Sequence, residues 1–269
     1  MNSIPKHPAR ELLLELQRRV PAGQHFVQEA FTSEHRRPVM VKLSALRPDN
    51  FYLFDEMTSV ALCDTVVDWA ARHGGARLTL TCPVFGEAQA RQHRLQHIAG
   101  KLGRIRLLAV GQPGTALSSS TRIEFQSITG SPLARYRIAL VEAKSAMLFI
   151  SREGGGKTPD GLHSLGFFTY DGNTIDEVAE DVDSLVHGLA RRLATFERLE
   201  VLHQATQRIT RELESYSRRM DLAVRRARRR PDLLTPARFN RIVGQAIAKM
   251  EQLKEIPRRA LRTIDRPPR

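Results

Sequence analysis

A long stretch without helix breakers constrains this chain most. From Thr174 to Arg230 there is no Pro and only one Gly, Gly188, which predicts one very long helical stretch. Its first part, up to Leu193, has a broad apolar face suited to packing on a sheet. Its later part has apolar residues at alternating spacings of four and three, and these residues are Ile209, Leu213, Tyr216, Met220, Ala223 and Ala227. Such a narrow seam is typical of a coiled coil or a helical hairpin.

A second helix with the same kind of seam is predicted over residues 236–256. Pro231 ends the long stretch, and Thr235-Pro236 suits a helix start. We expect Pro257 to end this second helix. Its seam consists of Phe239, Val243, Ala246, Met250 and Leu253. Two seams joined by a short turn predict an antiparallel helical hairpin.

The preceding residues predict a mixed α/β domain. A strand, a helix and a strand at 76–82, 87–102 and 104–110 indicate a parallel strand pair, because a helix crossover joins the strands. Four consecutive strands are then expected as hairpins, at 121–128, 134–143, 146–152 and 163–171. Helices are expected at 9–20 and, after Asp49, at 50–73, with two short extended runs at 25–31 and 38–44. The predicted fold class is thus an α/β domain with a mixed sheet, followed by a long helix and an antiparallel basic helical hairpin.

The formal net charge of +13 is unevenly distributed. Residues 201–269 contain 18 Lys or Arg and 7 Asp or Glu, whereas residues 1–200 contain 24 and 22. The last quarter of the chain therefore carries a net charge of +11, which suggests a near-neutral domain with a basic segment that faces an acidic partner. We divide the chain into an N-terminal helix and lead-in (1–35), an α/β sensory-like domain (36–196), a basic helical hairpin (197–257) and a basic tail (258–269).

The arginines of the hairpin are the strongest functional signal. The predicted nucleic-acid-binding residues are Arg218, Arg219, Arg225, Arg226, Arg228, Arg229, Arg230, Arg238 and Arg241. Arginine binds phosphates in a bidentate manner, and neutralising several phosphates releases counterions, so a DNA or RNA partner is favoured. The alternative is an adaptor or assembly protein, which forms homo-oligomers through its C-terminal helices and binds an acidic protein through these arginines.

A second group of arginines is a weaker candidate for a small-molecule site. In the strand at 134–143, Arg135 and Arg137 share a face, and Arg122 and Glu124 of the preceding strand are expected opposite them. Either the side chains form cross-strand ion pairs, or Arg122, Arg135 and Arg137 line an anion-binding pocket.

No motif supports catalysis, a cofactor or a metal. Gly154 to Thr158 lacks the earlier glycine and the following helix of a phosphate-binding loop. His93 and His97 lie four residues apart on a helix without further ligands, and Cys63 and Cys82 are expected to be reduced and buried. Asp55, Glu56 and Asp64 leave a paired-carboxylate site open. No membrane-spanning stretch and no secretory signal are visible, so we expect a cytoplasmic protein that does not bind membranes.

Two segments of the predicted α/β domain carry a family resemblance: Arg137–Glu153, and the run Gly166–Asp171 that leads into a helix. With them the chain resembles the DICT sensory domain of bacterial diguanylate cyclases and two-component proteins. A similar strand-strand-helix ending occurs in phospholipase-D-like effector lobes of transcription regulators. The resemblance covers roughly residues 36–196 and implies a signal-sensing α/β domain without catalysis. We therefore expect a bacterial regulatory protein whose basic hairpin binds nucleic acid.

Overall fold

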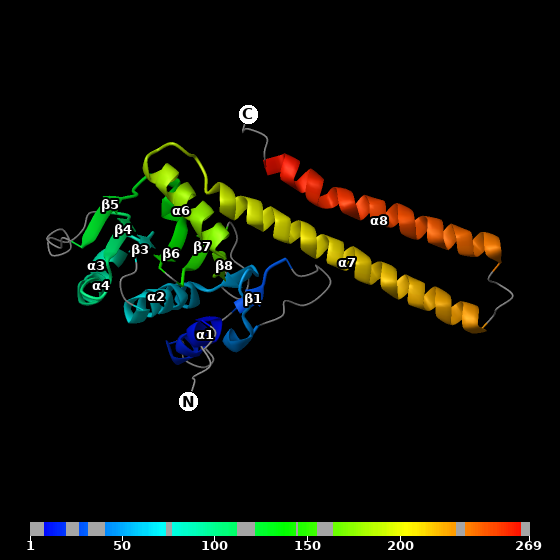
Figure 1. The fold of residues 1–269 in the computed structure, drawn as a ribbon, viewed down its shortest axis with the longest axis horizontal. Coiled ribbons are helices and arrows are strands. Elements are labelled where there is room, and N and C mark those ends of the chain that lie inside the picture. Colours follow the sequence, from blue (N-terminus) through cyan, green and yellow to red (C-terminus); the bar gives the residue numbers. More distant parts are fainter. Residues whose placement is uncertain are drawn as a thin grey trace. The chain divides into compact units, whose positions relative to one another are not determined.

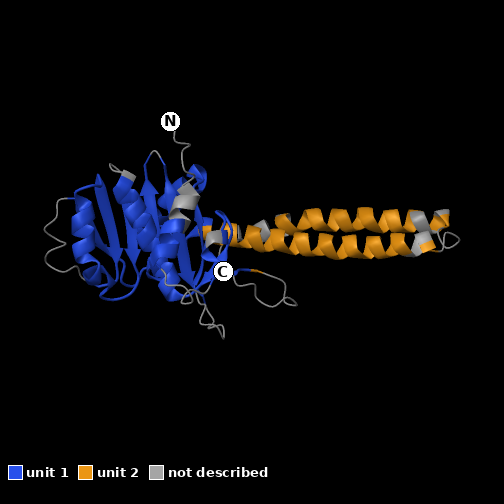
Figure 2. Ribbon diagram, turned by 90° about the horizontal axis from the view of Figure 1, so that it is seen from below, with its two compact units in different colours: residues 1–30, 36–195 blue, residues 31–35, 196–269 orange. Residues whose placement is uncertain are grey.

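The computed structural model of the 269-residue chain describes residues 8–19, 27–31, 41–73, 77–111, 122–143, 145–154, 164–229 and 235–264. For residues 8–13, 44, 73, 226–228, 236, 238–239 and 258–264 only the backbone is described. The chain divides into two compact units (Figure 2). Unit 1 comprises residues 1–30 and 36–195, and unit 2 comprises residues 31–35 and 196–269.

Unit 1 is built on one mixed sheet of eight strands, in the order β1-β2-β8-β7-β6-β3-β4-β5. The strands are β1 (Val27–Glu29), β2 (Tyr52–Phe54), β3 (Arg77–Cys82), β4 (Arg104–Ala109), β5 (Ile123–Ser127), β6 (Tyr136–Glu142), β7 (Met147–Glu153) and β8 (Ser164–Thr169). β3, β4 and β5 are parallel, and the other neighbouring pairs are antiparallel. The predicted parallel pair of β3 and β4 and the predicted hairpins of β6, β7 and β8 are thereby confirmed.

Helices cover both faces of this sheet (Figure 1). One face packs against α1 (Pro8–Arg19), α2 (Glu56–His73), α3 (Glu87–Ala90) and α4 (Gln92–Ala99) around a shared hydrophobic core. The opposite face carries α6 (Gly172–Val186), whose Ile175, Val178 and Val182 are buried. The remaining elements of unit 1 are two 3-10 turns, η1 (Leu43–Ala45) and η2 (Pro132–Arg135). Because the sheet is covered twice, residues Tyr136 to Val141 of β6 are all buried.

The predicted helix over 50–73 begins later than expected. Phe54 belongs to β2, and α2 starts at Glu56. Asp55 provides the helix cap, since its carboxylate accepts hydrogen bonds from the Thr58 backbone N–H at 2.7 Å and the Thr58 hydroxyl at 2.8 Å. In the expected extended run 38–44, residues 38–40 lie outside the described part and Leu43 belongs to η1.

The predicted hairpin between 121–128 and 134–143 is wrong. β5 pairs in parallel with β4 and forms one edge of the sheet, whereas β6 lies between β3 and β7. Residues on both faces of β6 are buried, so β6 takes a central place in the sheet, away from β5. The predicted helix 87–102 is also interrupted, because Arg91 separates α3 from α4.

The predicted single helix from Thr174 is interrupted at Gly188. α6 ends at Val186, and α7 (Ala194–Arg229) begins after a short connection. Gly188 has a φ of +70°, in the left-handed region that favours glycine. Its N–H donates to the Leu185 carbonyl at 3.2 Å, and the Leu189 N–H donates to the Ser184 carbonyl at 2.8 Å. These two bonds form a Schellman motif, so a single glycine ends the helix.

Unit 2 contains the expected antiparallel hairpin, formed by α7 and α8 (Pro236–Ile264) (Figure 2). Pro257 does not end the second helix, because α8 continues through it to Ile264. The first part of the predicted basic tail is therefore helical, and residues 265–269 lie outside the described part. In the described segments no helix has an apolar stretch long enough to cross a membrane.

Candidate functional site

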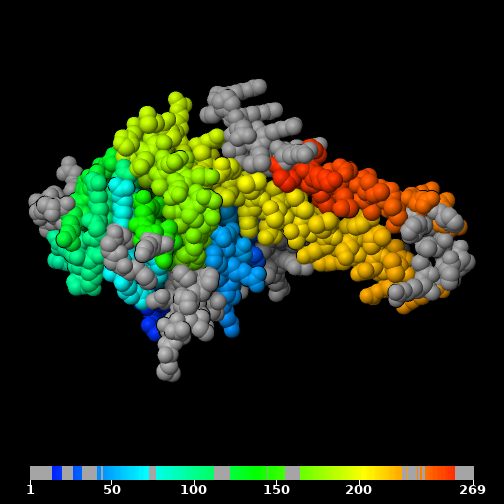
Figure 3. Space-filling model, viewed as in Figure 1, coloured from blue at the N-terminus to red at the C-terminus, as the bar shows by residue number. Residues whose placement is uncertain are grey.

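The register of the hairpin determines which arginines face outward. Lys249 Nζ lies 2.8 Å from the Glu212 carboxylate, which pairs the middle of α7 with the middle of α8. The hydrogen bond from Lys249 and its positive charge lower the pKa of Glu212 below its ordinary value. The more protected residues define the seam, and they are Ala205, Ile209, Glu212, Tyr216, Met220 and Ala223 in α7 and Ile242, Ala246, Lys249, Leu253 and Ile256 in α8. The space-filling view shows the surfaces of α7 and α8 in contact along the hairpin (Figure 3).

The predicted binding arginines of α7 whose side chains are described are exposed. Arg218, Arg225 and Arg229 are spaced by seven and four residues, so at 100° per residue they form one stripe on the side of α7 opposite the seam. Arg219 lies between this stripe and the seam and is exposed as well. On α8, Arg241 is exposed. The side chains of Arg226, Arg228 and Arg238, and the whole of Arg230, lie outside the described part.

Acidic residues are scarce where these arginines gather. We call residues 215–248 the basic segment, which contains the end of α7, the turn and the start of α8. It contains nine arginines and, as its only acidic residues, Asp221 and Asp232, a net charge of +7. Glu214 Oε2 lies 3.5 Å from Arg218, but both side chains are largely exposed, so water and salt screen this pair. The basic segment therefore presents a concentrated positive charge to solvent.

The groove between α7 and α8 differs from the basic segment in charge. It has a volume of about 760 Å³, lies toward the other end of the hairpin, and is lined by Ala205, Arg208, Leu253 and Ile256. Glu212, Glu251 and Glu255 also line it. These carboxylates offset its positive charges, so the groove is a poor site for a polyanion.

The three predicted ligand-binding arginines of unit 1 do not meet. Arg122 precedes β5 at the sheet edge and donates hydrogen bonds to the backbone carbonyls of Ala99 at 3.2 Å and Gly100 at 3.0 Å. The expected cross-strand arrangement with β6 is absent because β5 pairs with β4, and Glu124 instead pairs with Arg104 at 2.6 Å. The prediction that Arg122 shares a pocket with Arg135 and Arg137 is therefore wrong.

The other two predicted ligand-binding arginines, Arg135 and Arg137, lie together. Both line a small cavity of about 10 Å³, with Ser151, Ser164, Glu56 and Glu153 among its walls. This volume is about that of one water molecule. Arg137 is buried and pairs with Glu87, whereas Arg135 is exposed. The cavity balances two arginines against two glutamates, so its charge does not favour an anion.

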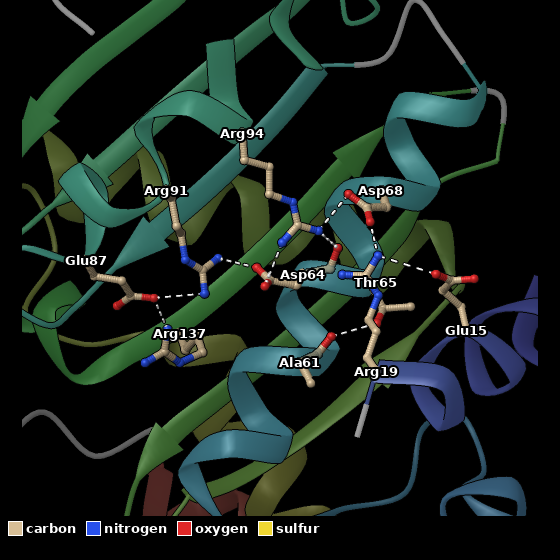
Figure 4. Close-up of polar contacts among 10 residues, drawn as sticks. All are labelled: Glu15, Arg19, Ala61, Asp64, Thr65, Asp68, Glu87, Arg91, Arg94 and Arg137. Atoms are coloured by element: carbon tan, nitrogen blue, oxygen red, sulfur yellow. Dashed lines mark hydrogen bonds and ion pairs between the residues drawn. The ribbon is translucent and has the colours of Figure 1, made fainter. Parts of the chain in front are cut away.

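An alternating chain of ion pairs begins at Arg137 (Figure 4). It was not predicted from the sequence. We call it the ion-pair ladder, and its order is Arg137, Glu87, Arg91, Asp64, Arg94, Asp68, Arg19 and Glu15. The Asp64 carboxylate lies 2.8 Å from the guanidinium group of Arg91 and 2.6 Å from that of Arg94. The ladder joins β6, α3, α4, α2 and α1. Acids and arginines at helical spacings in 64–68 and 87–94 were its only signal in the sequence.

The structure also places the other candidate residues. Asp64 forms ion pairs with two guanidinium groups, Asp55 caps α2, and Glu56 lines the small cavity of about 10 Å³. His93 and His97 are exposed on α4. Among the described residues there is no group of three or more His, Cys, Asp or Glu side chains that could hold a metal ion. Residues 155–158 of the glycine-rich run lie outside the described part.

Both cysteines are free and buried, as expected. Burial raises the pKa of the Cys63 thiol to about 11 and also raises that of Cys82. Both thiols therefore remain protonated near neutral pH, and a protonated thiol is a poor nucleophile. Their chemistry is that of small core residues.

Comparison with protein-family models gives no match, and neither does comparison with curated proteins. Among solved structures, the chain is similar to a polyphosphate kinase from Porphyromonas gingivalis, with 13% sequence identity and a TM-score of 0.31. The likeness covers 47% of this chain and 21% of the kinase, so the matched part spans about a fifth of that protein. We draw no conclusion about fold or function from it.

Proposed function

We propose that this chain is a non-catalytic regulatory protein whose hairpin of α7 and α8 binds nucleic acid. One observation carries the proposal: the basic segment has nine arginines against two aspartates, and each arginine side chain described there is exposed. Guanidinium groups that point into solvent can contact phosphates without first breaking buried ion pairs. Counterion release from several such contacts supplies affinity that does not depend on base sequence.

The hairpin suits phosphate contacts better than base stacking. Proteins that bind single strands without sequence preference place aromatic rings along a basic groove. In the basic segment the aromatic residues are Tyr216 and Phe239, and Tyr216 belongs to the seam. We therefore infer that duplex backbones, DNA or RNA, are the preferred ligands.

We further propose that unit 1 senses a signal without catalysis, as the resemblance to DICT domains implies. Its central ionisable groups support a non-catalytic role, because Glu87, Arg91 and Asp64 form ion pairs with one another in the ion-pair ladder. Groups that are held in this way are not poised to exchange protons with a substrate. A small molecule that binds two arrangements of unit 1 with different affinities would supply the signal.

Salt dependence of binding tests the nucleic-acid proposal. We expect labelled duplex DNA and RNA to bind the full chain at low salt, with an affinity that falls steeply as salt rises. The variant Arg218→Gln/Arg225→Gln should reduce the slope of log K against log salt by about 2, because each phosphate contact contributes about 0.9. The matched control is Arg77→Gln/Arg104→Gln, which removes the same charge from exposed arginines of unit 1. It should leave the slope unchanged.

Two outcomes contradict the proposal. If neither duplex is retained at low salt, the hairpin does not bind nucleic acid, and the arginines serve an acidic protein partner instead. If both double variants lower the slope equally, binding reflects the net charge of the whole chain rather than the hairpin.

A further inference from the structure

The two helices of the hairpin do not bury their own seam. Among the described residues between 206 and 252, none reaches full burial, although Ile209, Met220 and Ile242 lie in the seam. By contrast, the central strands of unit 1 contain many side chains without any exposed surface. Two helices alone leave both sides of their contact open to water, and further helices are normally needed to close such a core.

A second apolar stripe lies beside the seam of each helix. On α8, Val243, Ile247 and Met250 are 39%, 58% and 58% exposed. The sequence pattern places Val243 and Met250 in the seam, but the structure shows that Ile242 and Lys249 occupy it instead. On α7, Leu213 and Val224 are 47% and 46% exposed. Large apolar side chains in a contiguous exposed group mark interaction surfaces.

These stripes lie on the same side of the hairpin. At 100° per residue, Val243, Ile247 and Met250 are rotated about 105° from the seam of α8 in the chain direction. Leu213 and Val224 are rotated about 75° from the seam of α7, in the same sense. Because the helices are antiparallel, rotations of the same sense bring both stripes to one side. We call this surface the apolar face; it consists of Leu213, Val224, Val243, Ile247 and Met250.

The arginines of the basic segment whose side chains are described lie away from the apolar face. The same construction rotates Arg219 by about 55° and Arg241 by about 100° from their seams in the opposite sense. The outer stripe of Arg218, Arg225 and Arg229 lies farther round α7, opposite the seam. No member of the apolar face carries a charge; the same construction places the positions of Arg228 and Lys254 on this side of the hairpin, beyond the two ends of the face.

We propose that the apolar face packs against the same face of a second copy of this chain. The exposed arginines described in the basic segment permit this contact, because they lie away from it when two copies meet there. An acidic helix would be attracted to the basic side instead. Two adjacent helices, each about 10 Å in diameter, make a side about 20 Å wide, so over a paired length of about 30 Å each copy offers about 600 Å². Two such faces exceed the roughly 1,000 Å² expected of a specific interface.

The resulting dimer would be a four-helix arrangement that closes both seams. A two-fold symmetric contact requires only that one patch be complementary to itself, which a flat, uncharged apolar surface satisfies. The dimer presents its arginine stripes on its outer sides. The contact stands on the apolar face alone, so it does not depend on whether nucleic acid is the ligand.

Mass measurement by light scattering on the full chain tests the contact. We expect a mass of about twice 30.4 kDa for the wild-type protein and a halving of this mass for Ile247→Glu. The matched control is Leu222→Glu, since Leu222 is 53% exposed on the arginine side of α7. It should remain dimeric. Circular dichroism should show the same helix content in both variants, because both positions are exposed.

Three results would overturn the proposal. They are a monomeric wild-type protein over a wide range of concentrations, a dimer that survives Ile247→Glu, and a dimer that both variants disrupt equally. Oxidative cross-linking provides a positive test that does not rely on disruption. Cys63 and Cys82 are the only cysteines and are buried, so Ile247→Cys adds an exposed thiol. We expect a covalent dimer from Ile247→Cys and none from Leu222→Cys, and the reverse pattern would refute the contact.

Discussion

Arginine has opposite roles in the two units of this protein. In unit 1, Arg91 and Arg137 are nearly buried and each contacts at least one carboxylate in the ion-pair ladder. In the hairpin, Arg218, Arg225 and Arg229 are exposed along one side of α7. An arginine that is already paired contributes to the fold, whereas an exposed one remains available for an external anion. Net charge alone does not distinguish these roles; burial does, because Arg218 lies 3.5 Å from Glu214 and both side chains are still largely exposed.

Side chains are also more deeply buried in unit 1 than in the hairpin. Unit 1 has a core in which Leu62, Leu107 and Phe149 have no exposed surface, whereas the described seam of the hairpin is only half-buried over most of its length. A change of side chain should therefore cost much more in unit 1. Trp69, the only tryptophan, is buried in α2, so its fluorescence reports on unit 1 alone.

Arg91→Met should have the largest effect. The substitution removes the guanidinium group that Asp64 and Glu87 share and leaves each carboxylate with one arginine, so the cost should be about 3 kcal/mol, at the lower end for breaking a buried ion pair. Arg218→Met in the hairpin should change the free energy of unfolding by less than about 0.5 kcal/mol. Urea unfolding followed by Trp69 fluorescence for Arg91→Met, and by circular dichroism for Arg218→Met, measures both values. Equal losses in the two variants would remove the distinction between paired and exposed arginines.

Two glycines provide a comparison that does not involve charge. A Cβ at Gly166 in β8 would lie 2.3 Å from the backbone oxygen of Ile150, so Gly166→Ala should destabilise unit 1 by about 3 kcal/mol. A Cβ at Gly244 in α8 meets nothing within 4 Å. Gly244→Ala should therefore stabilise the hairpin by about 1 kcal/mol, because alanine favours the helix.

The two measurements use different signals. Trp69 fluorescence follows Gly166→Ala, and the thermal loss of helical circular dichroism follows Gly244→Ala. A neutral Gly166→Ala variant would show that β7 and β8 can separate to admit a methyl group. A destabilised Gly244→Ala variant would show that a partner helix approaches α8 closely at this position.

The sequence predicted much of unit 1, because periodicity is local. Alternating apolar residues located β3, β4, β6, β7 and β8, and the crossover helix implied the parallel pair. Strand order is a long-range property, so the position of β5 was missed. The end of α6 was missed because one glycine in an otherwise helical pattern does not show whether its φ is positive, as it is at Gly188.

For the candidate sites, too, local features could be predicted and long-range contacts could not. Exposure of the arginines on α7 follows from their spacing, and it is found wherever their side chains are described. The ion-pair ladder joins residues from five elements, and nothing local in the sequence indicates that Arg137 reaches Glu87. The apolar face was missed for a subtler reason: the apolar pattern of α8 is wide enough for two stripes, and only the register with α7 shows which one is the seam.

Alkaline pH should weaken unit 1 and not the hairpin. Burial raises the pKa of Cys63 from 9.0 to about 11, so the folded protein holds a proton that the unfolded chain releases. The free energy of unfolding should be constant below pH 9; between pH 9 and 11 Cys63 should lower it by about 2 kcal/mol, and the buried Cys82 should add to this fall. Cys63→Ala should reduce the decline in the Trp69 signal by the share of Cys63 and leave the share of Cys82. A decline of the same size in the variant would assign it to other groups.

The smallest effect should come from the ion pair within the hairpin. Lys249 and Glu212 are 2.8 Å apart, but their side chains are 35% and 40% exposed, so solvent screens them. A double-mutant cycle with Lys249→Gln and Glu212→Gln, measured by thermal circular dichroism, should give a coupling of about 0.5 kcal/mol. Because Lys249 lowers the pKa of Glu212, this coupling should be present above pH 4.5 and lost as the pH falls through the lowered value. A coupling as large as that expected for Arg91 would mean that the pair is buried in solution, which only a partner over the seam could cause.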